Sequence, residues 1–447
     1  MENAAEGLPS HILNLLHRTF SLNKENVLII CDYISSLKSE INLSDHYRKD
    51  VITLLCKFST FNNARSFKDI TREDLLSFLD SFRKSDTADQ LHKWIGTYNI
   101  YAIHLTKFFK WLYNPGIEPN KRLKPEVVQN IPQLKRKEKS IYKPTDLWTA
   151  EDDSLFLKYC PNPRDRCYHA MSRDSACRPH ELLKLRIKDI VFKLTPDKKQ
   201  YAEILVNGKT GTRHIPLIDS IPHIKDWISQ HPQSGNANGI LLCGFGKSLN
   251  KIIHVTSLHK IYQQYRKMFF PKLLDNPNVS PEDKQKIGEL LKKPWNPYVR
   301  RHSALTEKSG MLKEHHLRQF AGWSPGSNTH LKYLHYFGNE SSESLLEAYG
   351  IVSKDKQISE ILRPKQCPNC NEPNKPDSKF CAKCKMVLTY DAYNETVENN
   401  QTSNKDLQII KEQIQTILGA IASVSQTEKN VIAKQLIEKG MYVNNSS

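Results

Sequence analysis

Five side chains in the second half of the sequence have the chemistry needed to cut a phosphodiester bond. They are two arginines, a lysine, a tryptophan and a tyrosine: Arg178, Lys209, Arg301, Trp323 and Tyr333. Guanidinium groups match phosphate oxygens with paired hydrogen bonds and offset the charge that builds during displacement at phosphorus. A tyrosine hydroxyl can attack phosphorus, and a lysine can protonate the leaving 5′-oxygen. The sequence has no obvious carboxylate cluster for Mg²⁺, so we expect this chemistry to need no catalytic metal.

The local sequence predicts how two of these groups are held. Arg178 precedes Pro179 in CRPHELL, and proline favours the first turn of a helix, so the arginine lies at a helix start. Glu181 follows one turn later and can support the arginine. The segment 208–211, Gly-Lys-Thr-Gly, separates two strand-like runs, which predicts a hairpin with Lys209 at its tip.

The order of these residues resembles the tyrosine recombinase (phage-integrase) family, most closely its archaeal integrase branch, over roughly residues 20–390. The resemblance implies that Arg178 and Arg301, the latter in PYVRRHSALT, bind the scissile phosphate together with Trp323. It implies that Tyr333, in the Tyr-x-His pattern of LKYLHYFG, is the nucleophile. It also implies a 3′-phosphotyrosyl intermediate formed without ATP or metal, and strand exchange within a homotetramer on double-stranded DNA.

Two positions leave the catalytic assignment open. Where the family pattern has a histidine three residues before the second arginine, this chain has Tyr298. A phenol ionises only near pH 10 and is a poor base, whereas histidine moves protons near neutral pH. His302 is a candidate substitute, although a residue after the box arginine is more typically packed and hydrogen-bonded. Tyr336 lies about one helical turn beyond Tyr333 and is the alternative nucleophile.

The charge of the chain indicates a polyanionic partner. Its 447 residues include 65 Lys+Arg against 48 Asp+Glu, a formal charge of +17, and the pI is about 9.2. A Lys- and Pro-rich segment before the second domain is either a solvated linker or a strap along the DNA backbone, and we favour the strap. The expected phosphate contacts are Lys135, Arg136, Lys137, Lys139 and Lys143 in this segment, and Arg300 and Lys332 beside the reacting groups.

Four of the ten cysteines form two Cys-x-x-Cys pairs separated by ten residues: Cys367, Cys370, Cys381 and Cys384. Four thiolates at this spacing suit a closed, tetrahedral Zn²⁺ site, which would stabilise a segment too small to fold on an apolar core. The segment resembles a zinc ribbon, so we expect a structural zinc ion and no cofactor for catalysis. An iron–sulfur site and a redox dithiol pair are the alternatives.

Apolar residues at three- and four-residue spacing predict a mainly α fold with a small β-hairpin or sheet. Helices are expected over residues 20–115, and also over RPHELLKLRIKDI, residues 178–190. The expected organisation is an N-terminal extension (1–19), a helical, SAM-like core-binding domain (20–116), a basic linker (117–145), a mixed α/β catalytic domain (146–352), a zinc-ribbon-like module (364–390), a polar linker (391–404) and a C-terminal helix (405–440). That last helix either packs alone or self-associates as a short coiled coil.

The composition favours a globular protein, with 38% hydrophobic and 25% charged residues. We see no apolar run of about 18 residues and no secretory signal, so we expect a cytoplasmic, nucleoid-associated protein that does not enter membranes. The predicted function is a site-specific DNA recombinase that integrates or excises a mobile element. The alternatives are a chromosome-dimer-resolving (Xer-like) recombinase, a type IB topoisomerase and a non-catalytic DNA-binding relative.

Overall fold

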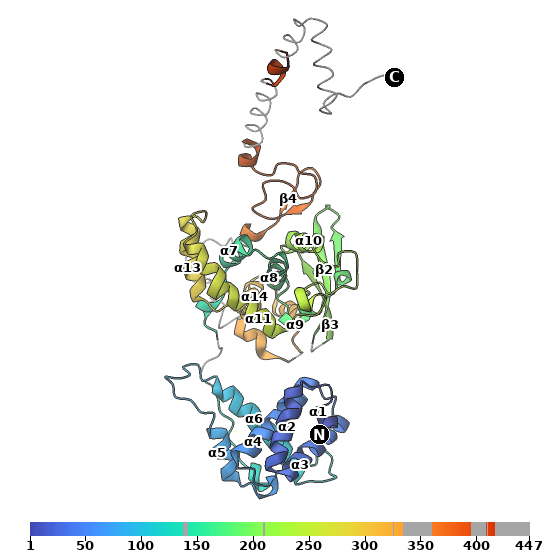
Figure 1. The fold of residues 1–447 in the computed structure, drawn as a ribbon, viewed down its shortest axis with the longest axis vertical. Coiled ribbons are helices and arrows are strands. Elements are labelled where there is room, and N and C mark those ends of the chain that lie inside the picture. Colours follow the sequence, from blue (N-terminus) through green and yellow to red (C-terminus); the bar gives the residue numbers. More distant parts are fainter. Residues whose placement is uncertain are drawn as a thin grey trace, which may run out of the picture. The chain divides into compact units, whose positions relative to one another are not determined.

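The computed structural model describes residues 1–136, 142–208, 211–324, 326–333, 360–394, 408 and 410–415. The chain divides into two compact units, Met1–Ile141 and Tyr142–Ser447. Figure 1 shows that both are built mainly from helices and that a small sheet lies in the second unit. The predicted mainly α fold with a small sheet is therefore confirmed. Among the described helices, none has the length and apolar character needed to cross a membrane.

The first unit is a bundle of helices around an aromatic core. Its helices are α1 (Glu2–Ala5), α2 (Ser10–Leu22), α3 (Lys24–Glu40), α4 (Asp45–Phe61), α5 (Arg72–Asp80) and α6 (Trp94–Leu112). Phe58 is fully buried, and its ring centroid lies 5.0 Å from that of Phe78 and 6.0 Å from that of Phe109. Helix α5 begins with a capping box in which Thr71 and Asp74 each accept a hydrogen bond from the other's backbone N–H.

Segments on both sides of the predicted bundle also pack into its core. Ile12 and Leu16 of α2, which lie within the predicted N-terminal extension, are buried. Val127 and Val128, within the predicted linker, are buried through a short 3₁₀ turn, Glu126–Val128. A pair of apolar residues is too short to show a helical period, so the sequence pattern does not reveal this anchor.

The second unit surrounds the central helix α8 (Pro163–Ser175). Its other helices are α7 (Ala150–Tyr159), α9 (Pro179–Leu183), α10 (Ile221–Ser229), α11 (Val255–Gln264), α12 (Phe270–Leu274), α13 (Pro281–Lys292), α14 (Pro297–Ser309) and α15 (Glu314–Ala321). Helix α8 packs against α7, α10 and α14, and also against the sheet.

The sheet of the second unit contains one strand more than the predicted hairpin. Strands β1 (Ile190–Leu194), β2 (Gln200–Gly208) and β3 (Gly211–Leu217) are antiparallel in the order β1-β2-β3. The predicted helix over residues 178–190 is wrong beyond Leu183: a 3₁₀ turn follows, and Ile190 pairs with Ile204 in the sheet. Pairing with the next strand, β2, overrides the local helical pattern here.

The cysteine-containing segment contacts the second unit. Its two short strands, β4 (Lys365–Gln366) and β5 (Pro373–Asn374), are antiparallel, and β5 packs against α10. Lys375 Nζ lies 2.7 Å from Asp226 Oδ2 on α10, and Lys225 forms a second ion pair with Glu372. These contacts hold the segment against the rest of the second unit. Of the predicted C-terminal helix, the structure describes only residues 408 and 410–415, which are helical.

Candidate active site

The site is built first around a buried carboxylate, Glu181. Helix α8 ends in Ala176, whose φ of 49° turns the chain, and Arg178 then caps the start of α9. The Glu181 side chain has no exposed surface. Its Oε2 accepts a hydrogen bond from the Arg178 backbone N–H at 2.8 Å, and its Oε1 accepts one from Arg178 Nη1 at 3.0 Å. The structure thus places Glu181 where it can orient the first arginine.

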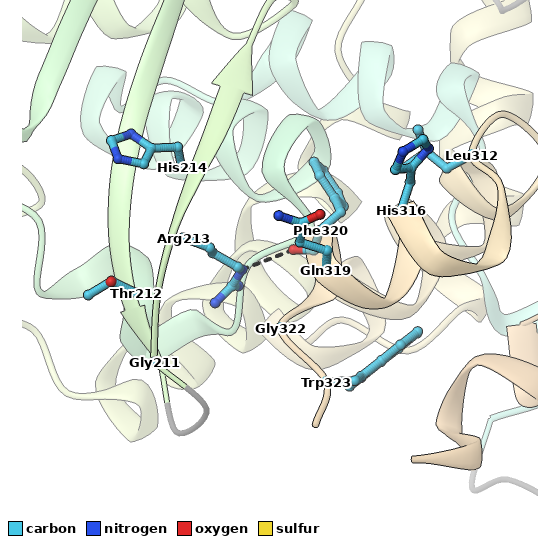
Figure 2. A pocket seen from close by; sticks show the side chains of 10 residues that line it. All are labelled: Gly211, Thr212, Arg213, His214, Leu312, His316, Gln319, Phe320, Gly322 and Trp323. Carbon is cyan, nitrogen blue, oxygen red and sulfur yellow. Dashed lines mark hydrogen bonds between the residues drawn. The ribbon is translucent and has the colours of Figure 1, made fainter. Parts of the chain in front are cut away.

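A second arginine, Arg213 on β3, shares the same carboxylate and was missed by the sequence analysis. Its Nη2 donates to Glu181 Oε2 at 2.8 Å, and its Nη1 donates to Oε1 at 3.2 Å. Its Nε donates to the Phe320 carbonyl oxygen at 2.9 Å, as Figure 2 shows. Arg213 therefore joins β3, α9 and the end of α15. A signal was present, because Arg213 lies on the same face of β3 as Ile215 and Leu217, which are both buried.

The two arginines keep Glu181 ionised although it is buried. Burial alone would raise the pKa of this carboxyl. Hydrogen bonds from Arg213 and from the Arg178 backbone outweigh burial and lower the pKa of Glu181 to about 2. Glu181 is therefore a permanent negative charge at neutral pH, and it holds two guanidinium groups in fixed directions.

Two glycines make room for this cluster. A Cβ atom added to Gly208 would lie 2.4 Å from Glu181 Oε1. A Cβ atom added to Gly322 would lie 2.7 Å from Arg213 Nη1, and the φ of Gly322 is +63°, which side chains rarely adopt. The backbone of β2 and the turn after α15 therefore pass directly against charged groups.

The second arginine of the predicted set, Arg301 on α14, is held by backbone carbonyls. Its Nη1 donates to the Ala176 carbonyl oxygen at 2.6 Å, and its Nη2 donates to the Ala321 carbonyl oxygen at 2.8 Å. Arg178 reaches the adjacent carbonyl, donating from Nη2 to Gly322 at 3.2 Å. Burial and the positive charge of Arg178 lower the pKa of Arg301 to about 10. Arg301 thus remains cationic at neutral pH, and the side chains of Arg178 and Arg301 converge on residues 321–322.

Two rings, those of Trp323 and His302, pack against Tyr333. The centroid of the Tyr333 ring lies 5.4 Å from that of the Trp323 ring and 5.7 Å from that of the His302 ring. In both pairs, the ring planes are inclined by 22° to each other. A hydrogen bond of 2.9 Å joins Tyr333 Oη to His302 Nδ1. Tyr333 is 3% exposed, and burial raises its pKa to about 12, while the charges of Arg301 and Arg178 act in the opposite direction.

A cavity of about 510 Å³ opens next to this cluster, between β3 and α15. Gly211 and Arg213 line one side, Gln319 and His316 line the other, and Trp323 lies at the edge (Figure 2). Gly208, the last residue of β2, pairs with Gly211, the first residue of β3, at the turn of the hairpin. Lys209, the predicted hairpin-tip lysine, lies between them and falls outside the described residues.

The remaining predicted positions differ in their exposure. Tyr298 is the second residue of α14, is 44% exposed and lies one turn before Arg301. Lys332 is half-buried beside Tyr333, whereas Lys135 and Lys143 are exposed and Arg136 is half-buried. Besides Lys209, three predicted positions lie outside the described residues: Lys137, Lys139 and the alternative nucleophile Tyr336.

The predicted contact of Arg300 with a DNA phosphate is wrong. Arg300 is completely buried, its Nη2 lies 2.7 Å from Asp153 Oδ1, and its guanidinium group lies 5.0 Å from the centroid of the Trp148 ring. Neighbouring residues on a helix point about 100° apart, so Arg300 faces the core while Arg301 faces the site. Its charge is neutralised inside the protein.

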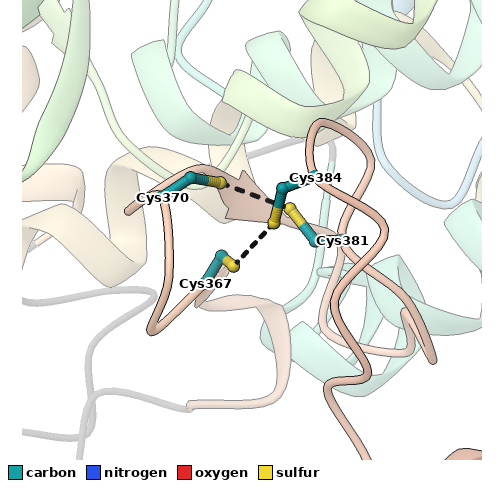
Figure 3. Close-up of side chains that lie close together, drawn as sticks. All are labelled: Cys367, Cys370, Cys381 and Cys384. Carbon is teal, nitrogen blue, oxygen red and sulfur yellow. Dashed lines mark hydrogen bonds between the residues drawn. The ribbon is translucent and has the colours of Figure 1, made fainter.

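The four cysteines form a compact cluster, as Figure 3 shows. All four sulfur atoms lie within 4.8 Å of one another. The Sγ atoms of Cys367 and Cys384 are 3.5 Å apart, and those of Cys370 and Cys381 are 3.6 Å apart. Four sulfurs bound tetrahedrally at about 2.3 Å from zinc would be about 3.8 Å apart, so the cluster fits a metal ion of that size.

The two halves of this cluster have the same backbone geometry. The residue after the second cysteine of each pair, Asn371 or Lys385, has a positive φ of 55° or 61°. Its backbone N–H donates to the carbonyl oxygen of the first cysteine of the pair, at 2.8 Å and 3.0 Å respectively. Each Cys-x-x-Cys pair is thus a tight turn that directs both thiols inward, as a metal site requires.

Comparisons with known proteins find similarity at the level of structure. No protein-family model and no curated protein sequence matches the chain. The XerH site-specific recombinase bound to palindromic difH substrate matches with 18% identity and a TM-score of 0.48, covering 75% of this chain and 94% of that one. A lambda integrase dimer bound to a COC′ core site has 12% identity and a TM-score of 0.46, covering 70% and 78%. The Tn1549 transposon integrase with circular intermediate DNA has 14% identity and a TM-score of 0.46, covering 71% and 99%.

Proposed function

We propose that this chain is a site-specific DNA recombinase of the tyrosine type. The observation that carries the proposal is the convergence of Arg178 and Arg301, two guanidinium groups held by backbone carbonyls, beside the hydroxyl of Tyr333. A phosphodiester bound by both arginines would lie next to a tyrosine able to attack it. The net charge of +17 supports DNA as the polymer that carries this phosphodiester.

In the proposed reaction, Tyr333 Oη attacks the scissile phosphorus and forms a 3′-phosphotyrosyl link. Arg178, Arg301 and the indole N–H of Trp323 stabilise the negative charge on the phosphoryl oxygens. Lys209 gives a proton to the departing 5′-oxygen. The energy of the broken bond is retained in the new phosphoester, so the hydroxyl of a partner strand can reverse the step without ATP.

Within this class, we propose integration or excision of a mobile element by a homotetramer assembled on double-stranded DNA. The resemblance to archaeal integrases and the additional cysteine module favour this assignment over the resolution of chromosome dimers. The two activities are distinguished by where the protein cuts, because an integrase cuts at the ends of an element and at its insertion site.

We also infer that the cysteine cluster binds a structural zinc ion. Four thiolates occupy every position of a tetrahedral site, which leaves no open position for a substrate or a reactive water. Cys367, Cys370, Cys381 and Cys384 would hold the ion and so order the segment that packs against α10.

Covalent trapping tests the proposed activity. Purified full-length protein is incubated with fragments of genomic DNA from the organism that encodes it, denatured with detergent, and the DNA that stays attached is sequenced. We expect attachment at one sequence for the wild type and none for Tyr333→Phe. Tyr390→Phe, at an exposed tyrosine of the cysteine module, is the matched control and should behave as the wild type.

Each alternative gives a different result in the same experiment. Adducts that persist in Tyr333→Phe would assign the nucleophile to Tyr336. Adducts at many unrelated sequences would indicate a topoisomerase. Tight DNA binding without any wild-type adduct would refute the proposed activity and favour a non-catalytic DNA-binding protein, with Tyr298 as the first residue to examine.

A further inference from the structure

The nucleophile candidate already has a base within hydrogen-bonding distance. His302 follows Arg301 on α14, and its Nδ1 lies 2.9 Å from Tyr333 Oη. The two rings are nearly parallel, with their centroids 5.7 Å apart, so the nitrogen lies beside the hydroxyl. On its other side, the His302 ring contacts the ring of Tyr142, at 5.1 Å between centroids. The imidazole is therefore held in place by packing.

The charges around His302 keep its imidazole neutral. Burial, Lys332 on the same segment as Tyr333, and Arg301 on α14 together lower the pKa of His302 to about 3. The facing phenol of Tyr142 is uncharged at neutral pH, because burial raises its pKa as well. A neutral imidazole with its proton on Nε2 presents a free electron pair at Nδ1, which is the atom that faces Tyr333.

We propose that His302 is the proton acceptor for Tyr333 in DNA cleavage; this inference rests on the proposed recombinase function. As Tyr333 Oη forms its bond to phosphorus, the Oη–H bond breaks and the proton moves to His302 Nδ1, which gives an imidazolium ion. The bond from phosphorus to the 5′-oxygen breaks, and that oxygen takes a proton from the general acid, proposed above to be Lys209. In rejoining, His302 returns its proton to Tyr333.

The DNA-free protein holds the proton on Tyr333, because the pKa of about 12 for Tyr333 far exceeds that of about 3 for His302. A bound phosphodiester changes both the basicity of His302 and the acidity of Tyr333. Its negative charge offsets Arg301 and Lys332 and so raises the pKa of His302. The phenol becomes strongly acidic as its oxygen bonds to phosphorus, so transfer accompanies attack. Cleavage would therefore require DNA in place.

The position of His302 on α14 also accounts for the substitution at Tyr298. The two residues are four positions apart on one helix, so they lie on the same face. Tyr298 is a phenol and a poor base, whereas His302 supplies an imidazole one turn further along the helix. The chain thus retains an imidazole beside the phosphate site.

Three variants separate proton transfer from positioning. His302→Ala removes the acceptor. His302→Asn keeps a hydrogen-bond acceptor near the place of Nδ1 but takes up no proton. His259→Ala, at an exposed histidine of α11, makes the same chemical change away from the site. Single-turnover adduct formation is measured for each full-length protein on the DNA sequence found by trapping, with DNA affinity and thermal unfolding measured in parallel.

We expect His302→Ala and His302→Asn to form adducts about 10²–10⁴ times more slowly than the wild type, with unchanged DNA affinity. Between pH 6 and 9, the wild-type rate should be nearly constant, whereas the rate of His302→Ala should rise about tenfold per pH unit as hydroxide replaces the base. Added imidazole should accelerate His302→Ala and leave His302→Asn and the wild type unchanged.

The outcomes distinguish this inference from the proposed function. If the wild type forms adducts and His302→Asn matches its rate, the recombinase function stands and the role of His302 as proton acceptor is refuted. The same holds if His302→Ala is slow but shows a flat pH profile and no response to imidazole, which would indicate positioning alone. If the wild type forms no adduct on any DNA, both proposals fail together.

Discussion

Replacing Glu181 by glutamine tests the central electrostatic feature of the site. Glu181 is the one described carboxylate that both Arg178 and Arg213 contact, and its side chain has no exposed surface. The glutamine variant has nearly the same shape but leaves two buried or half-buried arginines without their shared negative charge. Removing one partner from a buried ion pair costs about 3–5 kcal/mol. We expect a loss of that size in the free energy of unfolding of the second unit.

The pKa of Glu181 gives an independent value for the same interaction. A pKa that falls from 4.5 to about 2 on folding corresponds to about 3 kcal/mol of stability. Because the folded state has the lower pKa, this contribution is fully present above about pH 4.5. It is lost as the pH falls from 4.5 towards 2. The stability difference between the wild type and Glu181→Gln should therefore shrink by about 3 kcal/mol over this range.

Urea unfolding followed by tryptophan fluorescence measures both effects. Trp148, Trp227 and Trp295 are buried in the second unit and report on its transition. Glu203→Gln removes a carboxylate of β2 that is paired with Lys193 in a more exposed position, and it should cost much less. A Glu181→Gln variant whose stability at pH 7 lies within about 1 kcal/mol of the wild type would refute the electrostatic account, as would a difference that does not change between pH 4.5 and 2.

Two further predictions concern the metal and the DNA backbone. Cys370→Ser should reduce the bound zinc from about one ion per chain to none and make residues 360–394 sensitive to protease, while the second unit keeps its own unfolding transition. Measurement of bound zinc and limited proteolysis check this prediction. A wild-type protein without zinc would contradict it. If Lys135 contacts one phosphate, Lys135→Ala should weaken binding to all DNA sequences alike. It should also reduce, by about 0.9, the steepness with which the logarithm of the observed binding constant falls with the logarithm of the salt concentration. DNA titrations at several salt concentrations give this slope, and an unchanged slope would remove Lys135 from the DNA contacts.

Features that depend on a few neighbouring residues could be predicted from the sequence. The capping box at Thr71, the start of α9 after Arg178 and the hairpin between β2 and β3 are all determined within about ten residues. The cysteine cluster could also be predicted from the sequence, because two neighbouring Cys-x-x-Cys pairs can supply all four ligands of a tetrahedral site without residues from other parts of the fold.

Features that depend on pairing between distant segments could not be predicted. The contact of Arg213 with Glu181 joins residues 32 positions apart, and that of His302 with Tyr333 joins residues 31 positions apart. Arg300 and Arg301 are equivalent as sequence neighbours, and only the packing of α14 on α8 buries the first and directs the second into the site.

In the proposed reaction, the charge of the arginine cluster would favour the transition state of phosphodiester cleavage over its ground state. Arg178, Arg213 and Arg301 carry three positive charges, and Glu181 neutralises one of them, which leaves two. A bound phosphodiester carries one negative charge, so it does not fully neutralise the cluster. The pentavalent phosphorane formed by attack of Tyr333 carries two and does so. Because the guanidinium groups of Arg178 and Arg301 are already fixed by the carbonyls of residues 176, 321 and 322, and that of Arg213 by the carbonyl of residue 320, this gain would need no reorganisation during the reaction.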